Sequence, residues 1–173
     1  MLENCSILVS SCDKYETTWP AYFGLLKKYW PEHPQNVYLS TETKNFMYEG
    51  MNITVVHPEK DCTWSERLYY CLSLIDTKYV LFSLEDFFLL DYVKTEKIEQ
   101  CKTWMEEDSN IAVCRLYGSD SEKLTEPYKN SSFRIAKNDI LYRLDTQAAI
   151  WNRESLMSFL DLSENPWQFE EQG

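Results

Sequence analysis

Apolar and polar positions follow two different rhythms along residues 1–116. Short continuous apolar runs predict buried strands, whereas apolar positions three or four residues apart predict helices. The runs fall at residues 5–10, 37–40, 53–57, 78–84 and 111–116, and the helical segments begin near Thr18, Thr63 and Thr95. Strands and helices that alternate in this order are typical of an α/β fold, in which helices flank a mostly parallel sheet.

The pattern changes after residue 116. Residues 117–130 are polar and acidic, and two short strands are predicted at 133–136 and 139–144 around a tight turn. An apolar run at 148–151 precedes a short helix that Asn152 can cap, and Asn165, Pro166 and Gln168 are the residue types of a further helix start. We expect one domain with a small mixed β/α C-terminal part. Its last helix is either very short or continues beyond Gly173.

The run at 78–84 ends abruptly in two adjacent acids, Glu85 and Asp86, and apolar residues follow again. A run of this kind suits a strand that is buried on both faces. Carboxylates between apolar segments are costly unless something compensates them, and open α/β sheets bind ligands at the carboxyl ends of their strands. The pattern therefore predicts a metal or substrate site at Glu85 and Asp86. The alternative is a turn whose acids face water.

Other polar residues follow predicted strands or begin a helix. Ser10, Ser11 and Asp13 end the first strand, and residues 142–147 lie near the later ones. The carboxyl ends of parallel strands share one edge of the sheet, so these groups can face one crevice. Asp13 could instead stabilise a turn. Arg67 lies in the first turn of a helix, where a cation opposes the helix dipole, so it could pair with a phosphate, with Glu66 or with Asp61.

The composition argues against several classes of binding site and active site. The net charge of −11 opposes nucleic-acid binding, which needs Lys and Arg against phosphates. Four glycines provide no glycine-rich phosphate loop, the GxSxG elbow of α/β-hydrolases is absent, and two histidines without HExxH argue against a zinc hydrolase. Carboxylate chemistry with Mg²⁺ or Mn²⁺ remains. Six cysteines without a CxxC pair and the lack of a long apolar run predict reduced thiols, no membrane-spanning helix and a cytoplasmic protein.

Three motifs in their order along the chain, LEDFFLL, YRLDTQAAIWNRESL and NPWQFEEQG, resemble GT-A-type glycosyltransferases. The closer resemblance is to bacterial enzymes that build cell-surface polysaccharides such as capsule or lipopolysaccharide. It extends over essentially the whole chain. It implies a GT-A-like, Rossmann-like sheet, with residues 1–116 as the nucleotide-binding half and residues 117–173 as the acceptor-side half.

The resemblance also implies roles for residues of the first half. Ser10, Ser11 and Asp13 would line the pocket for the base and ribose, and Trp64 and Arg67 would close over the nucleotide or its phosphates.

Asp86, together with Glu85, would take the place of the family's Asp-x-Asp motif and hold the divalent cation against the diphosphate. Gln147 and Trp151 would border the acceptor or donor sugar, and Glu170 or Glu171 would be the general base of an inverting displacement. The strict Asp-x-Asp is absent, since the sequence has Ser83, Leu84, Glu85 and Asp86 at this place.

The predicted function is transfer of a sugar from a nucleotide-sugar donor, UDP by default, to a hydroxyl of a sugar or lipid-linked acceptor. Contact with the inner face of a membrane is compatible with such an acceptor. One alternative is a non-catalytic nucleotide- or carbohydrate-binding protein on the same fold. A nucleotidyltransferase would need a basic phosphate grip, which the few Lys and Arg near the loops do not favour. An interaction module would display an exposed aromatic patch.

Overall fold

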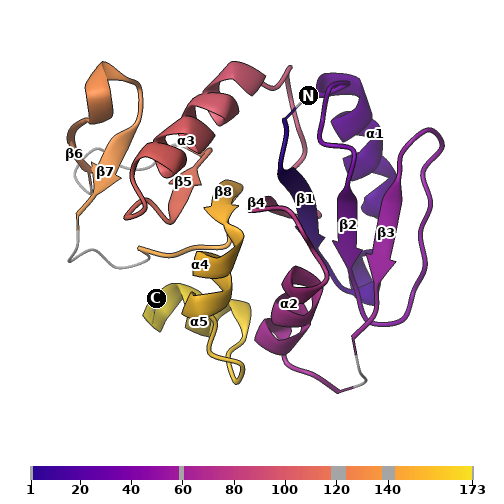
Figure 1. Ribbon diagram of the computed structural model, residues 1–173. Helices are drawn as coiled ribbons and strands as arrows, with labels where there is room; N and C mark the ends of the chain where they lie inside the picture. Colours follow the sequence, from indigo (N-terminus) through magenta and orange to yellow (C-terminus); the bar gives the residue numbers. More distant parts are fainter. Residues whose placement is uncertain (1, 59–60, 118–123, 138–142, 173) are drawn as a thin grey trace.

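A computed structural model describes residues 2–58, 61–117, 124–137 and 143–172. Its main feature is a six-stranded sheet of order β3-β2-β1-β4-β8-β5 (Figure 1). The first four of these strands are parallel, and β8 is antiparallel to both of its neighbours. The strands are β1 (Cys5–Ser10), β2 (Val37–Ser40), β3 (Ile53–Val56), β4 (Tyr79–Leu84), β5 (Val113–Arg115) and β8 (Ala149–Asn152).

Helices cover both faces of this sheet. Successive side chains of a strand point to opposite faces, so Ile7 and Val9 pack with α1 and α3, while Leu8 packs on the opposite side with α2, α4 and α5. Two covered faces explain why all six residues of β1 are buried. The helices are α1 (Trp19–Tyr29), α2 (Trp64–Ser73), α3 (Thr95–Glu107), α4 (Arg153–Phe159) and α5 (Pro166–Gln172). The predicted α/β fold is thus confirmed.

Local capping residues start three of the helices. Thr63 and Glu66 form the predicted capping box at α2, and Asn152 accepts a hydrogen bond from the Ser155 N–H at α4. Asn165 and Gln168 cap α5 reciprocally through their side chains. The third helix, α3, begins at Thr95 as expected, but Thr95 is not the capping residue that its side chain suggests. Lys94 occupies the cap position, and the Thr95 hydroxyl instead accepts a hydrogen bond of 2.8 Å from the Trp30 indole.

In the C-terminal part, the strands pair with different partners from those predicted. The apolar run at 148–151 forms β8, which inserts between β4 and β5. A separate two-stranded antiparallel sheet joins β6 (Leu124–Pro127) to β7 (Arg134–Ala136), with a short 3-10 helix at Tyr128–Asn130 between them. The predicted partner strand at 139–144 lies mostly outside the described residues. Trp104 of α3 contacts Tyr128 and Phe133 edge-on, and this packing attaches the small sheet to the main domain.

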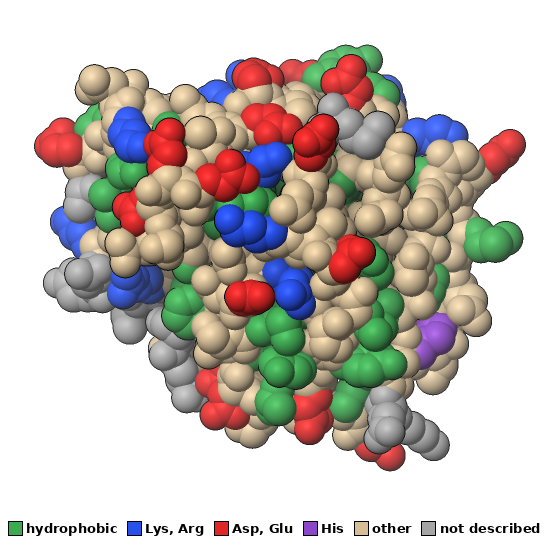
Figure 2. All heavy atoms as spheres, viewed as in Figure 1, with side chains coloured by type: hydrophobic (Ala, Val, Ile, Leu, Met, Phe, Trp, Pro, Cys, Tyr) green, Lys and Arg blue, Asp and Glu red, His purple; other side chains and the backbone are tan. Residues whose placement is uncertain are grey.

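One face of the molecule carries both signs of charge. Figure 2 shows acidic and basic side chains interspersed over the upper and central part of this face, with hydrophobic side chains gathered in the lower part of the view.

Candidate active site

The candidate site lies at one edge of the main sheet, where β1, β2 and β4 end. Ser10 is in register with Ser40 of β2 and with Leu84 of β4, so the three strands end at the same level. The chain leads from β1 to β2 on one side of β1, whereas β4 pairs with β1 on the other side. The carboxyl end of β1 is therefore a topological switch point, where open α/β sheets bind their ligands. Because β8 is antiparallel and Ala149 pairs with Phe82, the residues before β8 reach the same edge.

Asp13 is held by the segment that follows β2. Its carboxylate accepts hydrogen bonds from the hydroxyls of Thr41 (2.6 Å) and Thr43 (2.5 Å) and from the N–H groups of Thr43 and Lys44 (both 3.1 Å). Burial by itself would raise the pKa of Asp13, but these hydrogen bonds outweigh it and hold the pKa well below its usual range. Asp13 thereby fixes the ends of β1 and β2 to each other.

Glu42 is a site residue that the sequence reasoning missed. Its carboxylate accepts a hydrogen bond from the Asp13 N–H and forms an ion pair of 2.8 Å with Arg67. Of the partners considered for Arg67, neither Glu66 nor Asp61 is the one observed. Glu42 follows the carboxyl end of the second strand, so the strand-end rule applied to Asp13 would have found it as well.

Two indole groups bind the serines that end β1. Trp64 donates to the Ser10 hydroxyl (3.1 Å), and Trp19 donates to the Ser11 hydroxyl (2.8 Å). The Trp64 ring also packs against the buried ring of Phe169, with 5.6 Å between centroids. Trp64 therefore connects the end of β1 with α5, the helix that carries Glu170.

The two acids after β4 have different environments. Glu85 is buried, with 7% of its surface exposed, whereas Asp86 is exposed. Burial raises the pKa of Glu85, the neighbouring charge of Asp86 adds to this, and hydrogen bonds from its own N–H and from the Ser11 hydroxyl act in the opposite direction. Asp86 is thus the acid of this pair that solvent can reach.

The positions of Glu85 and Asp86 suit one mode of divalent-cation binding, in which the protein supplies few of the ligands. Among the residues the structure describes, no group of three or more His, Cys, Asp and Glu is arranged to hold a metal ion. Mg²⁺ is commonly bound through one or two carboxylates together with substrate phosphates and water, without a complete protein cage. The exposed Asp86 carboxylate suits that mode, because it leaves the remaining positions to a diphosphate.

The two C-terminal acids also differ. Glu170 points back to the segment before β8, and its Oε1 accepts hydrogen bonds from the N–H (2.8 Å) and the hydroxyl (2.6 Å) of Thr146. Glu171 is exposed, and its carboxylate has no such anchor within the described residues. Thr146 was not singled out from the sequence, although it lies within the candidate stretch 142–147, of which residues 143–147 are described.

A salt bridge lies beside Glu170. Asp145 pairs with Arg115 of β5 at 2.9 Å. Burial raises the pKa of Asp145, while Arg115 and the Gln147 N–H lower it and the charge of Glu170 raises it again. Gln147 lies in this segment, half-buried, with its N–H directed at Asp145.

Trp151 is the one predicted site residue that the structure places elsewhere. It lies in β8 with 2% of its surface exposed, and it packs against Phe159 in the core under α2 and α4. Its neighbour Ile150 points to the opposite face of the sheet, as strand alternation requires.

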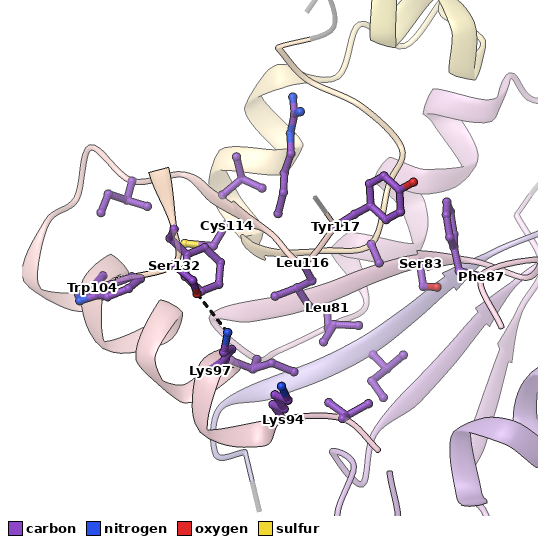
Figure 3. A pocket seen from close by; sticks show the side chains of 18 of the residues that line it. Leu81, Ser83, Phe87, Lys94, Lys97, Trp104, Cys114, Leu116, Tyr117 and Ser132 are labelled. Atoms are coloured by element: carbon purple, nitrogen blue, oxygen red, sulfur yellow. Dashed lines mark hydrogen bonds between the residues drawn. The ribbon is translucent and has the colours of Figure 1, made fainter. Parts of the chain in front are cut away.

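A cavity of about 1610 Å³ opens beside Asp86 and runs over the end of β4, α3, β5 and β7. Figure 3 shows Ser83, Phe87 and Tyr117 at one side of this cavity, Leu81 and Leu116 on its floor, and Trp104 and Cys114 at the opposite side. The Lys97 ammonium donates to the Ser132 hydroxyl across it (3.1 Å). The cavity therefore extends from the acids after β4 into the second half of the chain.

The fold is similar to that of solved proteins. The chain shares its fold with S. aureus TarS. A crystal structure of TarS 1-349 superimposes with a TM-score of 0.58 at 14% identity, over 96% of this chain and 52% of that one. The same protein in complex with UDP-GlcNAc gives a TM-score of 0.53 at 17% identity, over 86% of this chain and 45% of that one.

A further TarS structure gives a TM-score of 0.53 at 16% identity, over 90% of this chain and 29% of that one. The chain thus spans about half the length of the TarS 1-349 structures. No protein-family model matches the sequence, and no curated protein matches it. At these identities the similarity concerns the fold. No helix in the described part of the chain is both long and apolar enough to cross a membrane.

Proposed function

We propose that this chain is a GT-A-type glycosyltransferase that transfers a sugar from a nucleotide-sugar donor, by default a UDP-sugar, to a hydroxyl acceptor with inversion. The observation that carries the proposal is the meeting of three groups at one sheet edge: the serines after β1, the acids after β4 and the Glu170 carboxylate held by Thr146. TarS, which has the same fold, was crystallised with UDP-GlcNAc, a nucleotide sugar. This supports the donor class.

The donor would lie across the ends of β1 and β2. Ser10, Ser11 and Asp13 border the base and ribose, and Asp13 acts by keeping the segment 41–44 in place. Arg67 and Trp64 close the pocket from α2. In the unliganded protein Glu42 neutralises Arg67, and a diphosphate entering the pocket competes with Glu42 for this guanidinium.

The residues after β4 would face the diphosphate. Asp86 offers its exposed carboxylate to Mg²⁺ or Mn²⁺, and Glu85 supports the turn from its buried position. When bound, the cation neutralises the negative charge that develops on the departing nucleoside diphosphate. Gln147, whose N–H donates to Asp145, would border the sugar.

Glu170 is proposed as the general base. Its Oε1 is occupied by Thr146, which leaves Oε2 to accept the proton of the acceptor hydroxyl as its oxygen bonds to the anomeric carbon and the bond to the diphosphate breaks. Residues 1–116 would then serve the donor and residues 117–173 the acceptor. The proposed setting is synthesis of a cell-surface polysaccharide in the cytoplasm, at the inner face of the membrane when the acceptor is lipid-linked.

Thermal melting tests this proposal. The protein is melted with UDP, UDP-GlcNAc and other nucleotide sugars, with Mn²⁺ and with EDTA. A ligand at 100 times its Kd adds about 2.7 kcal/mol of stability, so binding gives a measurable shift. We expect a shift with UDP or a UDP-sugar that EDTA removes and that Asp86→Ala abolishes without a change in the unliganded melt.

Three outcomes of these experiments would contradict parts of the proposal. A shift that persists in EDTA and in Asp86→Ala would contradict the metal site. Absence of a shift with every nucleotide would contradict the proposed function. Donor binding without turnover of any acceptor would favour the non-catalytic binding protein on this fold.

A further inference from the structure

Arg115, the last residue of β5, holds the segment before β8 at two points. Its Nη1 forms an ion pair of 2.9 Å with Asp145 Oδ2, and its Nη2 donates a hydrogen bond to the Arg143 carbonyl. The side chains of the ion pair are only 21% and 15% exposed. Because a guanidinium presents its donors in a fixed plane, two acceptors on one segment define both the position and the orientation of that segment.

The backbone attaches the residues that follow. Arg115 pairs with Ala149 in the antiparallel ladder, and the Leu116 N–H donates to the Ala148 carbonyl (2.9 Å). Residues 143–147 lie beyond this ladder, and the Arg115 guanidinium attaches them to β5. The side chain of Arg115 thus extends the connection between β5 and the chain leading into β8.

The attached segment contacts the proposed base. Thr146 is buried and donates both its N–H (2.8 Å) and its hydroxyl (2.6 Å) to Glu170 Oε1. Asp145 precedes Thr146 directly, and its Oδ1 accepts a hydrogen bond from the Gln147 N–H (3.2 Å). The carboxylate that Arg115 binds therefore fixes the backbone on both sides of Thr146.

The ion pair also balances the charges around Glu170. Burial raises the pKa of Asp145, the Arg115 guanidinium lowers it, and the charge of Glu170 raises it again. Without Arg115, a half-buried carboxylate would stand unpaired close to a second carboxylate, and the two would repel each other. The guanidinium therefore allows the segment to stay close to Glu170 despite the like charges.

We propose that Arg115 is a positioning residue, which directs the Glu170 carboxylate toward the acceptor hydroxyl through the segment 143–147. This inference rests on the proposed function, because it concerns the base of that reaction. Arg115 also lines the cavity beside Asp86. A direct contact between Arg115 and the acceptor is therefore the alternative that the experiments have to distinguish.

Amide hydrogen exchange, followed by NMR, tests the chain of contacts without a substrate. In Arg115→Met the Thr146 N–H should leave Glu170 more often, so we expect its exchange to be at least about tenfold faster relative to the amides of β1. Asp145→Asn keeps the side-chain shape and the bond to the Arg143 carbonyl, so the increase should be smaller. Unchanged exchange at Thr146 in both variants would overturn the inference.

The matched control is Lys129→Met. It removes a cation from the exposed ion pair between Lys129 and Glu107, which lies outside the segment 143–147. Exchange at Thr146 relative to β1 should not change. An equal increase in Lys129→Met and Arg115→Met would contradict a local effect of Arg115.

Steady-state rates of UDP release from UDP-GlcNAc, with glycerol as the hydroxyl acceptor, separate positioning from acceptor contact. We expect Arg115→Met to lower kcat by about 10–100-fold with unchanged KM for both substrates, because a small misplacement of a reacting group has this effect. Arg115→Lys keeps a cation for Asp145 but not the second bond, so it should recover part of kcat. A raised KM for glycerol with unchanged kcat would overturn positioning in favour of direct contact.

A double-mutant cycle with Thr146→Val tests the route of the effect. If Arg115 acts through Thr146, the loss of kcat in Arg115→Met/Thr146→Val should be smaller than the product of the two single losses. A loss equal to that product would show that Arg115 acts by another route and would overturn the inference.

The two readouts keep this inference distinct from the proposed function. Faster exchange at Thr146 in Arg115→Met, in a protein that binds no nucleotide, retains the contacts of Arg115 and overturns the glycosyltransferase. Donor binding and turnover that Arg115→Met leaves unchanged retain the glycosyltransferase and overturn the positioning role.

Discussion

The two sides of the candidate site are built in contrasting ways. On the proposed donor side, polar groups at the ends of β1 and β2 are hydrogen-bonded to one another, since Asp13 accepts four hydrogen bonds from residues 41–44 and Glu42 joins Arg67 to the Asp13 backbone. On the proposed acceptor side, the wall comes from the segment 86–94, α3 and β7, and it is largely apolar with an exposed rim.

This contrast has a functional meaning. A nucleotide presents the same polar groups in every reaction cycle, and preorganised hydrogen bonds recognise it without a cost of rearrangement. An apolar wall selects by size and shape and tolerates variation in the ligand. Under the proposed function, the fixed polar network would serve the donor, and the more permissive apolar cavity would serve the acceptor.

The largest expected effect is the loss of the base. Glu170→Gln keeps the hydrogen bonds from Thr146 but cannot take a proton, so turnover should fall by about 10²–10⁴-fold while donor binding is unchanged. Steady-state rates with UDP-GlcNAc and calorimetric donor titration measure the two quantities. Glu171→Gln is the matched control and should retain activity. If Glu171→Gln loses turnover and Glu170→Gln does not, the base is the neighbouring residue.

A smaller effect on turnover is expected at Thr146, which contacts the proposed base Glu170. Thr146→Val removes the hydroxyl that holds Glu170 but leaves the backbone N–H bond in place. We expect a fall of about tenfold in kcat with little change in the KM for the donor, because a charge-assisted hydrogen bond is lost. Thr146→Ser restores the hydroxyl and should restore kcat. A loss of kcat in Thr146→Ser without a loss in Thr146→Val would instead indicate a packing role for the Thr146 methyl group.

Much of the first half of the fold followed from local sequence. Continuous apolar runs located β1, β2 and β4, and residue pairs such as Thr63 with Glu66 located a helix start, because these signals act between neighbours in the chain. The strand-end rule then brought Ser10, Asp13 and Glu85 to one edge. It would also have found Glu42 had it been applied to every strand.

The second half depended on distant contacts. Nothing within residues 148–151 indicates that β8 pairs antiparallel between β4 and β5, since that order is decided by the whole sheet. The same pairing turns Trp151 into the core, where the sequence motif had suggested a sugar contact. The hydrogen bonds between Thr146 and Glu170 span 24 positions, so no local spacing could reveal them.

Measurements of unfolding stability test whether the charge of Asp13 holds the ends of β1 and β2 together. Asp13→Asn should lower the free energy of unfolding at pH 7 by about 1–3 kcal/mol, because hydrogen bonds to a charged acceptor are lost. The pKa of Asp13 is lowered by folding, so its contribution is complete above the unfolded value near pH 3.9 and is lost as the pH falls further.

Urea unfolding at pH 7 and at pH 3 measures this difference, which should shrink at pH 3. The exposed Asp76→Asn is the control and should change stability little at either pH. A difference for Asp13→Asn that is the same at both pH values would show that its charge does not contribute.

The smallest expected effect is a gain in stability at Glu85, in contrast to the loss expected at Asp13. Folding raises the pKa of Glu85, so its ionisation opposes folding from the unfolded value near pH 4.3 upward. Glu85→Gln should therefore stabilise the unliganded protein at pH 7 by about 0.5–1 kcal/mol, with no gain below pH 4. Asp86→Asn, at an exposed position, is the control and should leave the stability unchanged. A loss of stability in Glu85→Gln would mean that the Ser11 hydroxyl and the backbone N–H hold the charged form more strongly than burial opposes it.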